Sequence, residues 1–327
     1  YRSSGGPLMK VLLSSACMMD CRYCPFSRYC RVPRERWPPG KLARAFTAAW
    51  QMGLVGGLFL SSGLYGDPER VAGDMVEEAR RVRELGFRGY IALRLMPGTP
   101  KWLVREALGV ADRVGVNLEA PSPSGLAEIA PSKGSWSLDL LGPLLYAARE
   151  ARDPRRVSTQ LVLGAAGETD EEHVTLAARL LGEGVGVIYY SPYTPVPGTP
   201  LARRRPPTPA WRARLLSEAV ALMRDYGYDP RWILDALDDR GMLPRPRSPG
   251  ETLKDVIARL HPEWYPVDPS TAGWSELVRV PGIGPKAASR ILRAREAARG
   301  ARLDAAVKAI LGPARYRRAR RYLHTTH

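Results

Sequence analysis

The sequence contains almost no side-chain amides: its 327 residues include one asparagine and two glutamines. Both residue types are thermolabile, so their scarcity predicts a thermophilic source. The sequence also lacks any uncharged apolar run of about 18 residues, so we expect no membrane-spanning helix. Four cysteines are too few for a disulfide scaffold in a chain of this length. Because 45% of the residues are hydrophobic, we expect the chain to fold around an ordinary packed core.

Acidic residues are also fewer than basic ones. The chain has 49 lysines and arginines against 33 aspartates and glutamates, which gives a net charge of +16. Arginine supplies nearly all of the positive charge, and its planar fork suits phosphate groups. An excess of this size predicts a polyanionic partner. A genome-wide preference for arginine is the alternative explanation.

Three of the four cysteines lie in one short segment, directly after the apolar run Leu8–Leu13. Cys17, Cys21 and Cys24 have the spacing C-x3-C-x2-C. Three thiolates on one tight loop can hold three irons of a 4Fe–4S cube and leave the fourth iron without a protein ligand. The amine and carboxylate of S-adenosylmethionine can chelate such an iron. The spacing, with Tyr23 before the third cysteine, resembles the radical S-adenosylmethionine (radical SAM) superfamily.

A zinc loop is the alternative interpretation of the cysteine segment. Zinc normally takes four ligands, usually as two separated pairs. The sequence has no second cysteine pair, and His173 and His261 are remote from the segment. A labile iron–sulfur cluster fits a reducing compartment, and no secretory signal is visible, so we expect a cytoplasmic protein.

Short apolar runs alternate with amphipathic helical patterns over residues 1–205. Strand–helix alternation predicts parallel βα units, and six units make a partial (β/α)6 barrel, as in the radical SAM enzymes. The active site of such a barrel lies at the C-terminal ends of the strands. We expect a helical extension and linker over residues 206–267, and a small all-α module over 268–327. The predicted strands are Met9–Leu13, Gly57–Ser61, Tyr90–Leu95, Arg113–Glu119, Ser158–Leu163 and Gly186–Ser191.

Five residues at the ends of the predicted strands are candidate contacts to S-adenosylmethionine. Ser61 and Ser62 stand where the superfamily usually carries a Gly-Gly-Glu segment, although this chain lacks the acid. Strand alternation places Asn117 and Glu119 on one side of the fourth strand. Gly164 permits close approach of the backbone in a segment that resembles the superfamily's Gly-x-x-Gly-Glu-Thr. Ordinary turns and structural hydrogen bonds are the alternatives.

Two further residues are candidates for catalysis. Cys30 lies near Arg28 and Arg31, which would lower its pKa, so it could donate a hydrogen atom to a product radical. The alternative is an inert thiol outside the cluster. Tyr193 follows the sixth strand, where an aromatic ring could stack a flipped base or simply plug the barrel.

The C-terminal segment Leu277–Ile291 predicts a helix-hairpin-helix motif. Gly282 and Gly284 allow a sharp turn, and their amides form an anion nest with the start of the next helix. Lys286 and Arg290 are the candidate side-chain contacts to nucleic acid. Residues 279–321 hold 13 lysines or arginines against two acids. A packing or protein-binding module is the alternative, and residues 311–315 could form a degenerate second hairpin.

Together these motifs resemble one family, the radical SAM proteins with a C-terminal helix-hairpin-helix that are described as DNA modification or repair proteins linked to uracil-DNA glycosylase. The resemblance covers almost the whole chain. It rests on Asp20–Cys24, Gly57–Gly63, Ser158–Gly164, His261–Asp268 and the Pro-Gly-Ile-Gly turn. The family usually has an Asn-Arg-Arg stretch after the third cysteine, which is absent here.

The resemblance implies an enzyme that uses a 4Fe–4S cluster and S-adenosylmethionine to generate a 5′-deoxyadenosyl radical and act on a base or sugar in DNA. It also implies an electron donor such as ferredoxin or flavodoxin. We favour DNA over RNA. The two alternatives are a radical SAM enzyme that modifies tRNA or rRNA, and a non-catalytic iron–sulfur protein that binds DNA.

Overall fold

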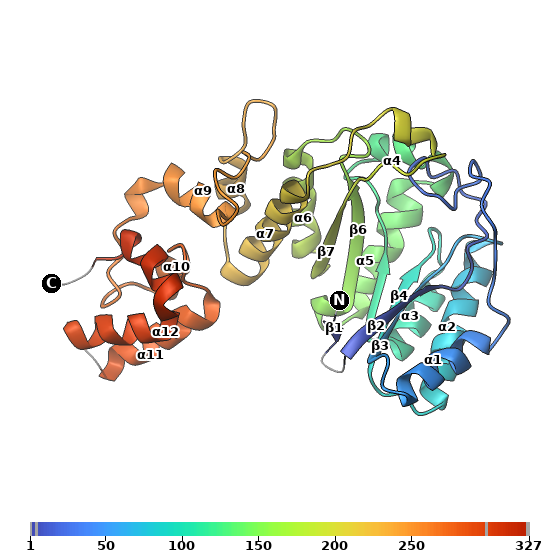
Figure 1. Ribbon diagram of the computed structural model, residues 1–327, viewed down its shortest axis with the longest axis horizontal. Coiled ribbons are helices and arrows are strands. Elements are labelled where there is room, and N and C mark those ends of the chain that lie inside the picture. The colour runs from blue at the N-terminus through green and yellow to red at the C-terminus, as the bar shows by residue number, and fades with distance from the viewer. Residues whose placement is uncertain (1, 4–5, 298–299, 325–327) are drawn as a thin grey trace. The chain divides into compact units, whose positions relative to one another are not determined.

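A seven-stranded sheet organises the first of two compact units, Tyr1–Ala213 and Arg214–His327 (Figure 1). The computed structural model describes residues 2–3, 6–297 and 300–324. The strands follow in sequence order, and all neighbours from β2 onwards are parallel, whereas β1 is antiparallel to β2. They are β1 (Arg2–Ser3), β2 (Gly6–Leu12), β3 (Gly57–Ser61), β4 (Tyr90–Leu95), β5 (Arg113–Val116), β6 (Val157–Leu163) and β7 (Val187–Pro192).

Helices connect the parallel strands and cover the outer side of the sheet (Figure 1). Neighbouring helices pack on one another in the order α1, α2, α3 and α5. The sheet is therefore a six-stranded parallel half-barrel, which confirms the predicted partial barrel architecture. The helices of this layer are α1 (Lys41–Gln51), α2 (Pro68–Glu84), α3 (Lys101–Val110), α4 (Pro123–Ile129), α5 (Gly142–Glu150), which a π-helix (Trp136–Leu141) precedes, and α6 (Asp170–Gly182).

The predicted and observed strands agree closely except at the fourth predicted strand. Gly57–Ser61 and Tyr90–Leu95 are strands with the predicted bounds. The predicted strand Arg113–Glu119 ends earlier, at Val116. Glu119 adopts φ 64°, in the left-handed region, which breaks the extended backbone.

Local capping explains where two helices begin. A capping box of Thr169 and Glu172 is present at the start of α6. Helix α1 has no local side-chain cap, and a remote residue supplies it instead. The buried carboxylate of Glu78, on α2, accepts hydrogen bonds from the N–H groups of Gly40 and Ala43. The sequence around α1 carries no sign of this contact.

The second unit is helical and has its own hydrophobic core, to which Leu277, Ile283, Ile291 and Val307 belong. The unit boundary falls inside α7 and inside the predicted segment 206–267, so the three-part division remains a prediction. Gly312, with φ 72°, interrupts the last long helix. The helices are α7 (Ala210–Tyr226), α8 (Pro230–Leu234), α9 (Leu253–Leu260), α10 (Trp274–Leu277), α11 (Pro285–Ala297) and α12 (Ala301–Ala319).

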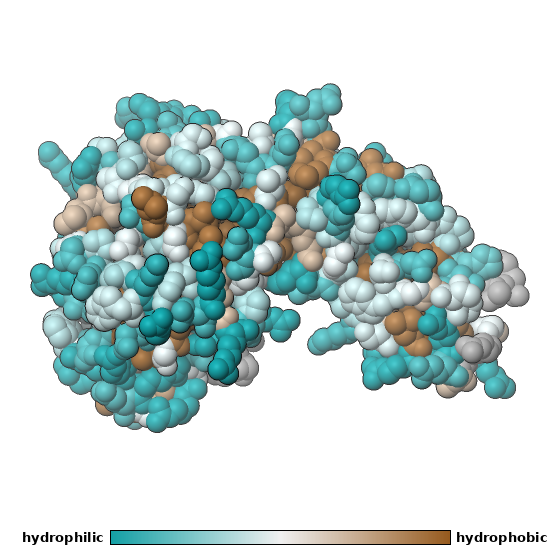
Figure 2. Space-filling model, turned by 180° about the vertical axis from the view of Figure 1, so that it is seen from behind, coloured by the Kyte–Doolittle hydropathy of each residue, from teal (hydrophilic) through white to brown (hydrophobic). Residues whose placement is uncertain are grey.

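The surface that Figure 2 displays is mostly hydrophilic over both units, with apolar side chains scattered among polar ones. Among the described residues, no helix combines the length and the apolar character needed to cross a membrane. Within the described residues, six short helical turns accompany the longer elements, including the one that carries Lys133. These turns are Pro131–Lys133, Pro154–Arg156, Pro200–Arg203, Pro262–Trp264, Arg320–Tyr322 and the π-helix already given.

Candidate active site

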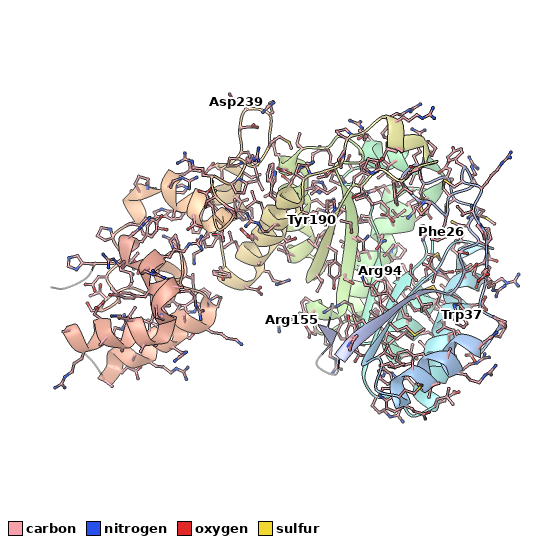
Figure 3. The ribbon with its side chains drawn as sticks, in the orientation of Figure 1. Phe26, Trp37, Arg94, Arg155, Tyr190 and Asp239 are labelled. Carbon is pink, nitrogen blue, oxygen red and sulfur yellow. The ribbon has the colours of Figure 1, made fainter. Side chains whose placement is uncertain are left out.

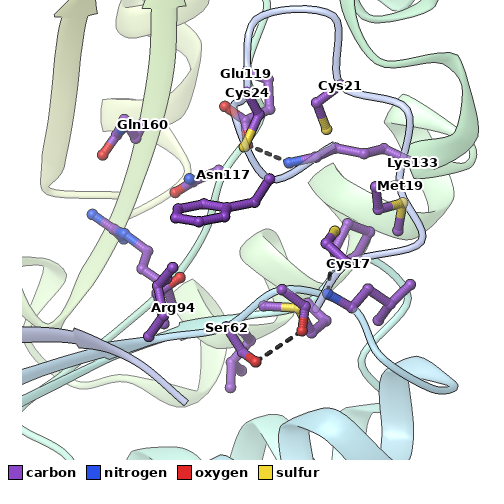
Figure 4. Close-up of a pocket in the computed structure, with 18 of the residues that line it drawn as sticks. Cys17, Met19, Cys21, Cys24, Ser62, Arg94, Asn117, Glu119, Lys133 and Gln160 are labelled. Atoms are coloured by element: carbon purple, nitrogen blue, oxygen red, sulfur yellow. Dashed lines mark hydrogen bonds and ion pairs between the residues drawn. The ribbon is translucent and has the colours of Figure 1, made fainter. Parts of the chain in front are cut away.

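The three clustered cysteines line one pocket at the C-terminal ends of the strands. The loop that carries Cys17, Cys21 and Cys24 leaves β2 there, and the pocket has a volume of about 220 Å³. Figure 4 shows the three thiols along one side of this pocket. The opposite side is built from β4, β6 and the segment that follows β5. Other lining residues include Phe26, Ser61, Ser62, Arg94, Asn117, Glu119, Lys133 and Gln160.

A buried aspartate fixes the middle of the cysteine loop. One carboxylate oxygen of Asp20 accepts hydrogen bonds from the Ser132 amide at 3.0 Å and the Ser132 hydroxyl at 2.7 Å. The Asp20 amide in turn donates to the Ser132 hydroxyl. Asp20 directly precedes Cys21, so these bonds fix the loop beside the turn that carries Lys133.

Arg34 fixes the end of the loop. Its guanidinium donates to the carbonyl oxygens of Ser15, Ser27 and Cys30 at 3.1, 2.8 and 2.9 Å, and also to that of Phe26. Buried carbonyl groups need such donors, because no strand or helix pairs them here. One side chain therefore joins the start and the end of the cysteine loop.

The turn after β3 contacts the first cysteine closely. The Leu64 amide donates to Cys17 Sγ at 3.4 Å. The preceding residue, Gly63, has no room for a side chain: a Cβ atom there would lie 2.4 Å from the Ala16 carbonyl oxygen and 2.9 Å from Cys17 Cβ. Hydrogen bonds to cysteine sulfur are one way in which a protein tunes an iron–sulfur cluster.

A buried ion pair beside the thiols was missed by the sequence analysis. Lys133 Nζ is paired with the Glu119 carboxylate; the Glu119 side chain is almost fully buried, and that of Lys133 is 14% exposed. Burial lowers the pKa of Lys133, but the negative groups of Glu119 and Cys21 outweigh it, so its pKa is raised. Only the folded chain brings Lys133 next to Glu119, so no local pattern could have identified it.

Glu119 itself occupies a strained position. It takes φ 64° while its amide donates to the Gln160 carbonyl and its own carbonyl accepts from the Val162 amide. Strand alternation predicted that Asn117 and Glu119 share one side, and both do line the pocket. The carboxylate of Glu119, however, is engaged by Lys133. A non-glycine residue held at positive φ by two β6 contacts is typical of a functional site.

The chemistry of the thiols suits a multinuclear cluster. Burial raises the pKa of Cys21 to about 12 and also raises that of Cys24. Binding of iron therefore has to displace thiol protons. In the described part of the chain, no three His, Cys, Asp or Glu side chains converge on a single metal position. A 4Fe–4S cube takes one thiolate per iron, which is what three cysteines around one pocket offer.

Asn117 also fits a bound cofactor. Its buried side-chain oxygen Oδ1 has no hydrogen-bond partner among the described residues, although it lines the pocket. A buried polar atom without a partner is costly and calls for a ligand donor. The Ser62 hydroxyl is less available to a ligand, because it already donates a hydrogen bond to the Gly63 carbonyl at 2.8 Å.

Three predicted site residues do not line this pocket. Gly164 has φ 83°, and a Cβ atom there would lie 2.0 Å from Thr208 Oγ1, so packing alone requires glycine. The Cys30 thiol donates to the carbonyl oxygens of Cys24 and Gly198. The ring of Tyr193 is buried. Their predicted contact to the cofactor or roles in catalysis remain predictions.

In the second unit, a tight turn over residues 278–284 joins α10 to α11. Gly282 has φ 95°, and a Cβ atom there would lie 2.7 Å from the Arg315 carbonyl oxygen. Lys254 Nζ donates to the Ile283 carbonyl from within the same unit. Lys286 and Arg290 are exposed on one face of α11, one turn apart.

Comparison with known proteins identifies the fold. No described protein family and no curated protein matches the sequence. Among solved structures, methylornithine synthase (PylB) is 15% identical with a TM-score of 0.55, covering 68% of this chain and 63% of that chain. HydG, a maturase of the [FeFe]-hydrogenase, is 14% identical with a TM-score of 0.54, covering 66% and 49%.

A second HydG structure, from Carboxydothermus hydrogenoformans, is 14% identical with a TM-score of 0.55, covering 68% of this chain and 53% of that chain. The chain thus spans less than two thirds of these proteins. These proteins are radical SAM enzymes, and the likeness shows that the half-barrel described above shares their fold. The helix-hairpin-helix module and the link to uracil-DNA glycosylase have no counterpart in these comparisons.

Proposed function

We propose that the protein is a radical SAM enzyme whose 4Fe–4S cluster is held by Cys17, Cys21 and Cys24. The observation that carries the proposal is the convergence of these thiols on the strand-end pocket of a fold whose known members use this cluster and S-adenosylmethionine. When bound and reduced, the cluster supplies one electron that breaks the bond from the sulfonium sulfur to the 5′ carbon, giving methionine and a 5′-deoxyadenosyl radical. Electrons come from a reductant such as ferredoxin or flavodoxin.

The chain's own residues bind and shield these groups. Asn117 offers its unpartnered oxygen to a hydroxyl or ammonium of the cofactor. Ser61 and Ser62 contribute small polar contacts from the turn after β3. The Lys133–Glu119 pair places a positive charge beside Cys21, which stabilises thiolate charge. The Asp20 and Arg34 contacts keep the cysteine loop in one conformation.

We also propose that the substrate is nucleic acid, with DNA preferred. The second unit presents the glycine turn of residues 278–284 at the start of α11, and we interpret this arrangement as the predicted helix-hairpin-helix. The first turn of a helix leaves amides without intrahelical partners, so it suits a phosphate. The exposed charges of Lys286 and Arg290 stand beside that turn. Such contacts position a duplex without reading its sequence.

The substrate proposal is tested by titrating the full chain with duplex DNA and with tRNA at matched salt. We expect tighter binding of DNA, with affinity that falls steeply as salt rises. Lys286→Ala should reduce the salt slope by about one unit if it contacts one phosphate. Lys308→Ala, which removes an exposed charge from α12, is the matched control. Equal effects of the two variants would mean that charge acts diffusely and would overturn the assignment of the hairpin.

A further inference from the structure

A buried arginine lies inside the half-barrel, across the pocket from the cysteines. Arg94, near the end of β4, is 4% exposed and lines the same pocket as the three thiols. Figure 3 places Arg94 within the sheet, and Figure 4 shows it on one side with Asn117 and Gln160. The neighbouring strand leaves room for it: a Cβ atom at Gly115 would lie 1.8 Å from Arg94 Nη1.

The guanidinium is only partly satisfied by the protein. Its Nη1 atom donates to the Ser158 hydroxyl at 2.7 Å and to the Ser158 carbonyl at 3.1 Å. The Arg94 Nε atom has no partner among the described residues. Aromatic rings of Phe59 and Tyr189 lie 5.5 and 5.4 Å from the guanidinium carbon, where a structural arginine would normally meet a carboxylate.

The charge persists despite the burial. Burial lowers the pKa of Arg94 to about 10, so the side chain stays protonated at neutral pH. A buried cation without an anion costs stability, and cation–π contacts recover only part of that cost. An anion that enters the pocket would therefore stabilise the folded chain, because an arginine fork binds oxyanions through two parallel hydrogen bonds.

We propose that Arg94 binds an oxyanion, a phosphate or a carboxylate, of the substrate. This inference rests on the proposed function for the identity of the second ligand. When bound, S-adenosylmethionine would be held through its amine and carboxylate on the cysteine side, whereas Arg94 faces the pocket from the other side. Arg94 thus supplies an unpartnered donor to this space.

The test uses the full chain with its cluster reconstituted and inorganic phosphate as the probe. Phosphate at about ten times its Kd should raise the Tm of the half-barrel by about 3–5 °C, with S-adenosylmethionine present or absent. Arg94→Met should lose this rise, and Arg94→Lys should retain part of it. Arg113→Met is the matched control, because the Arg113 guanidinium is already bonded to the Arg155 carbonyl and the Tyr189 hydroxyl.

A second readout separates a binding role from a structural one. If Arg94 is kept for a ligand, Arg94→Met removes an unpaired buried charge and should leave the Tm without phosphate unchanged or higher. A fall in that Tm, or an undiminished phosphate effect, would overturn the proposal. Loss of the phosphate effect when S-adenosylmethionine is added would assign the site to the cofactor carboxylate and would also overturn it.

The two proposals fail separately. Phosphate binding that depends on Arg94 in a protein that never cleaves S-adenosylmethionine would support the anion site and contradict the proposed enzyme activity. Cleavage of S-adenosylmethionine without any phosphate binding would support the proposed enzyme activity and contradict the anion site. Measuring 5′-deoxyadenosine in the same preparations decides which of the two has failed.

Discussion

Replacing Gly63 with alanine should displace the cysteine loop. The new Cβ atom would lie 2.4 Å from the Ala16 carbonyl oxygen, and ordinary van der Waals contact begins at 3.4 Å. The carbonyl therefore has to retreat by the difference, about 1 Å. Cys17 Cβ, at 2.9 Å, has to move with it.

The backbone on both sides resists that movement. The Gly63 amide donates to the Ser14 carbonyl at 2.7 Å, and the Met18 amide donates to the Leu64 carbonyl at 2.8 Å. Overpacking of this kind costs about 1–3 kcal/mol. For a unit of this size, each kcal/mol lowers the Tm by about 2–4 °C, so we expect a fall of about 2–12 °C. The displaced Cys17 should also lower the iron content after reconstitution.

Circular dichroism of the apo protein and iron analysis after anaerobic reconstitution measure the two effects. The control is Gly73→Ala on α2, where a Cβ atom meets nothing within 4 Å. In a helix interior this change should stabilise the protein by about 0.5–1 kcal/mol. If Gly63→Ala melts and loads iron like the wild type, the close contact between the β3 turn and the cysteine loop does not hold the cluster site together.

Two further predictions concern buried charges. Lys133→Met should destabilise the half-barrel by about 3–5 kcal/mol, because it leaves the buried Glu119 carboxylate without its partner. The double variant Lys133→Met with Glu119→Gln should lose much less stability. Equal losses in thermal melts would argue against the ion pair. Burial, with Arg318 nearby, lowers the pKa of Lys254 from 10.5 to about 7. The folded chain then holds fewer protons than the unfolded chain between these values, so stability should rise with pH across this window, by about 5 kcal/mol at most. Lys254→Met should flatten that rise in urea titrations at pH 7 and 9, and an unchanged slope would contradict the shift.

The sequence predicted the parts of the site that are local. The spacing of Cys17, Cys21 and Cys24 identifies a cluster loop because all three ligands lie within one turn of chain. Strand–helix alternation fixes the parallel order of the sheet, and so places that loop at the strand ends. Asn117 is predicted because a polar residue at a strand end faces the barrel interior, and its side chain does line the pocket.

Contacts between remote segments could not be predicted. Lys133 lies on a short turn, and only its ion pair with Glu119 marks it as part of the site. Glu119 in turn leaves the strand conformation, with φ 64°. Arg94 sits in an apolar strand where alternation alone suggests nothing about its partners. Gly164 remains a predicted cofactor contact, and the packing against Thr208, a residue 44 positions later, is a reason for glycine that no local pattern reveals.

The most direct test of the central claim is to add S-adenosylmethionine to the anaerobically reconstituted and reduced protein and to record its electron paramagnetic resonance spectrum. Binding at an iron that lacks a protein ligand should change the spectrum of the single 4Fe–4S cluster, and 5′-deoxyadenosine should then accumulate. Cys21→Ala should show neither signal, while Cys30→Ala should show both. A cluster whose spectrum ignores S-adenosylmethionine, or one that persists without Cys21, would contradict the assignment of this pocket as a radical SAM active site.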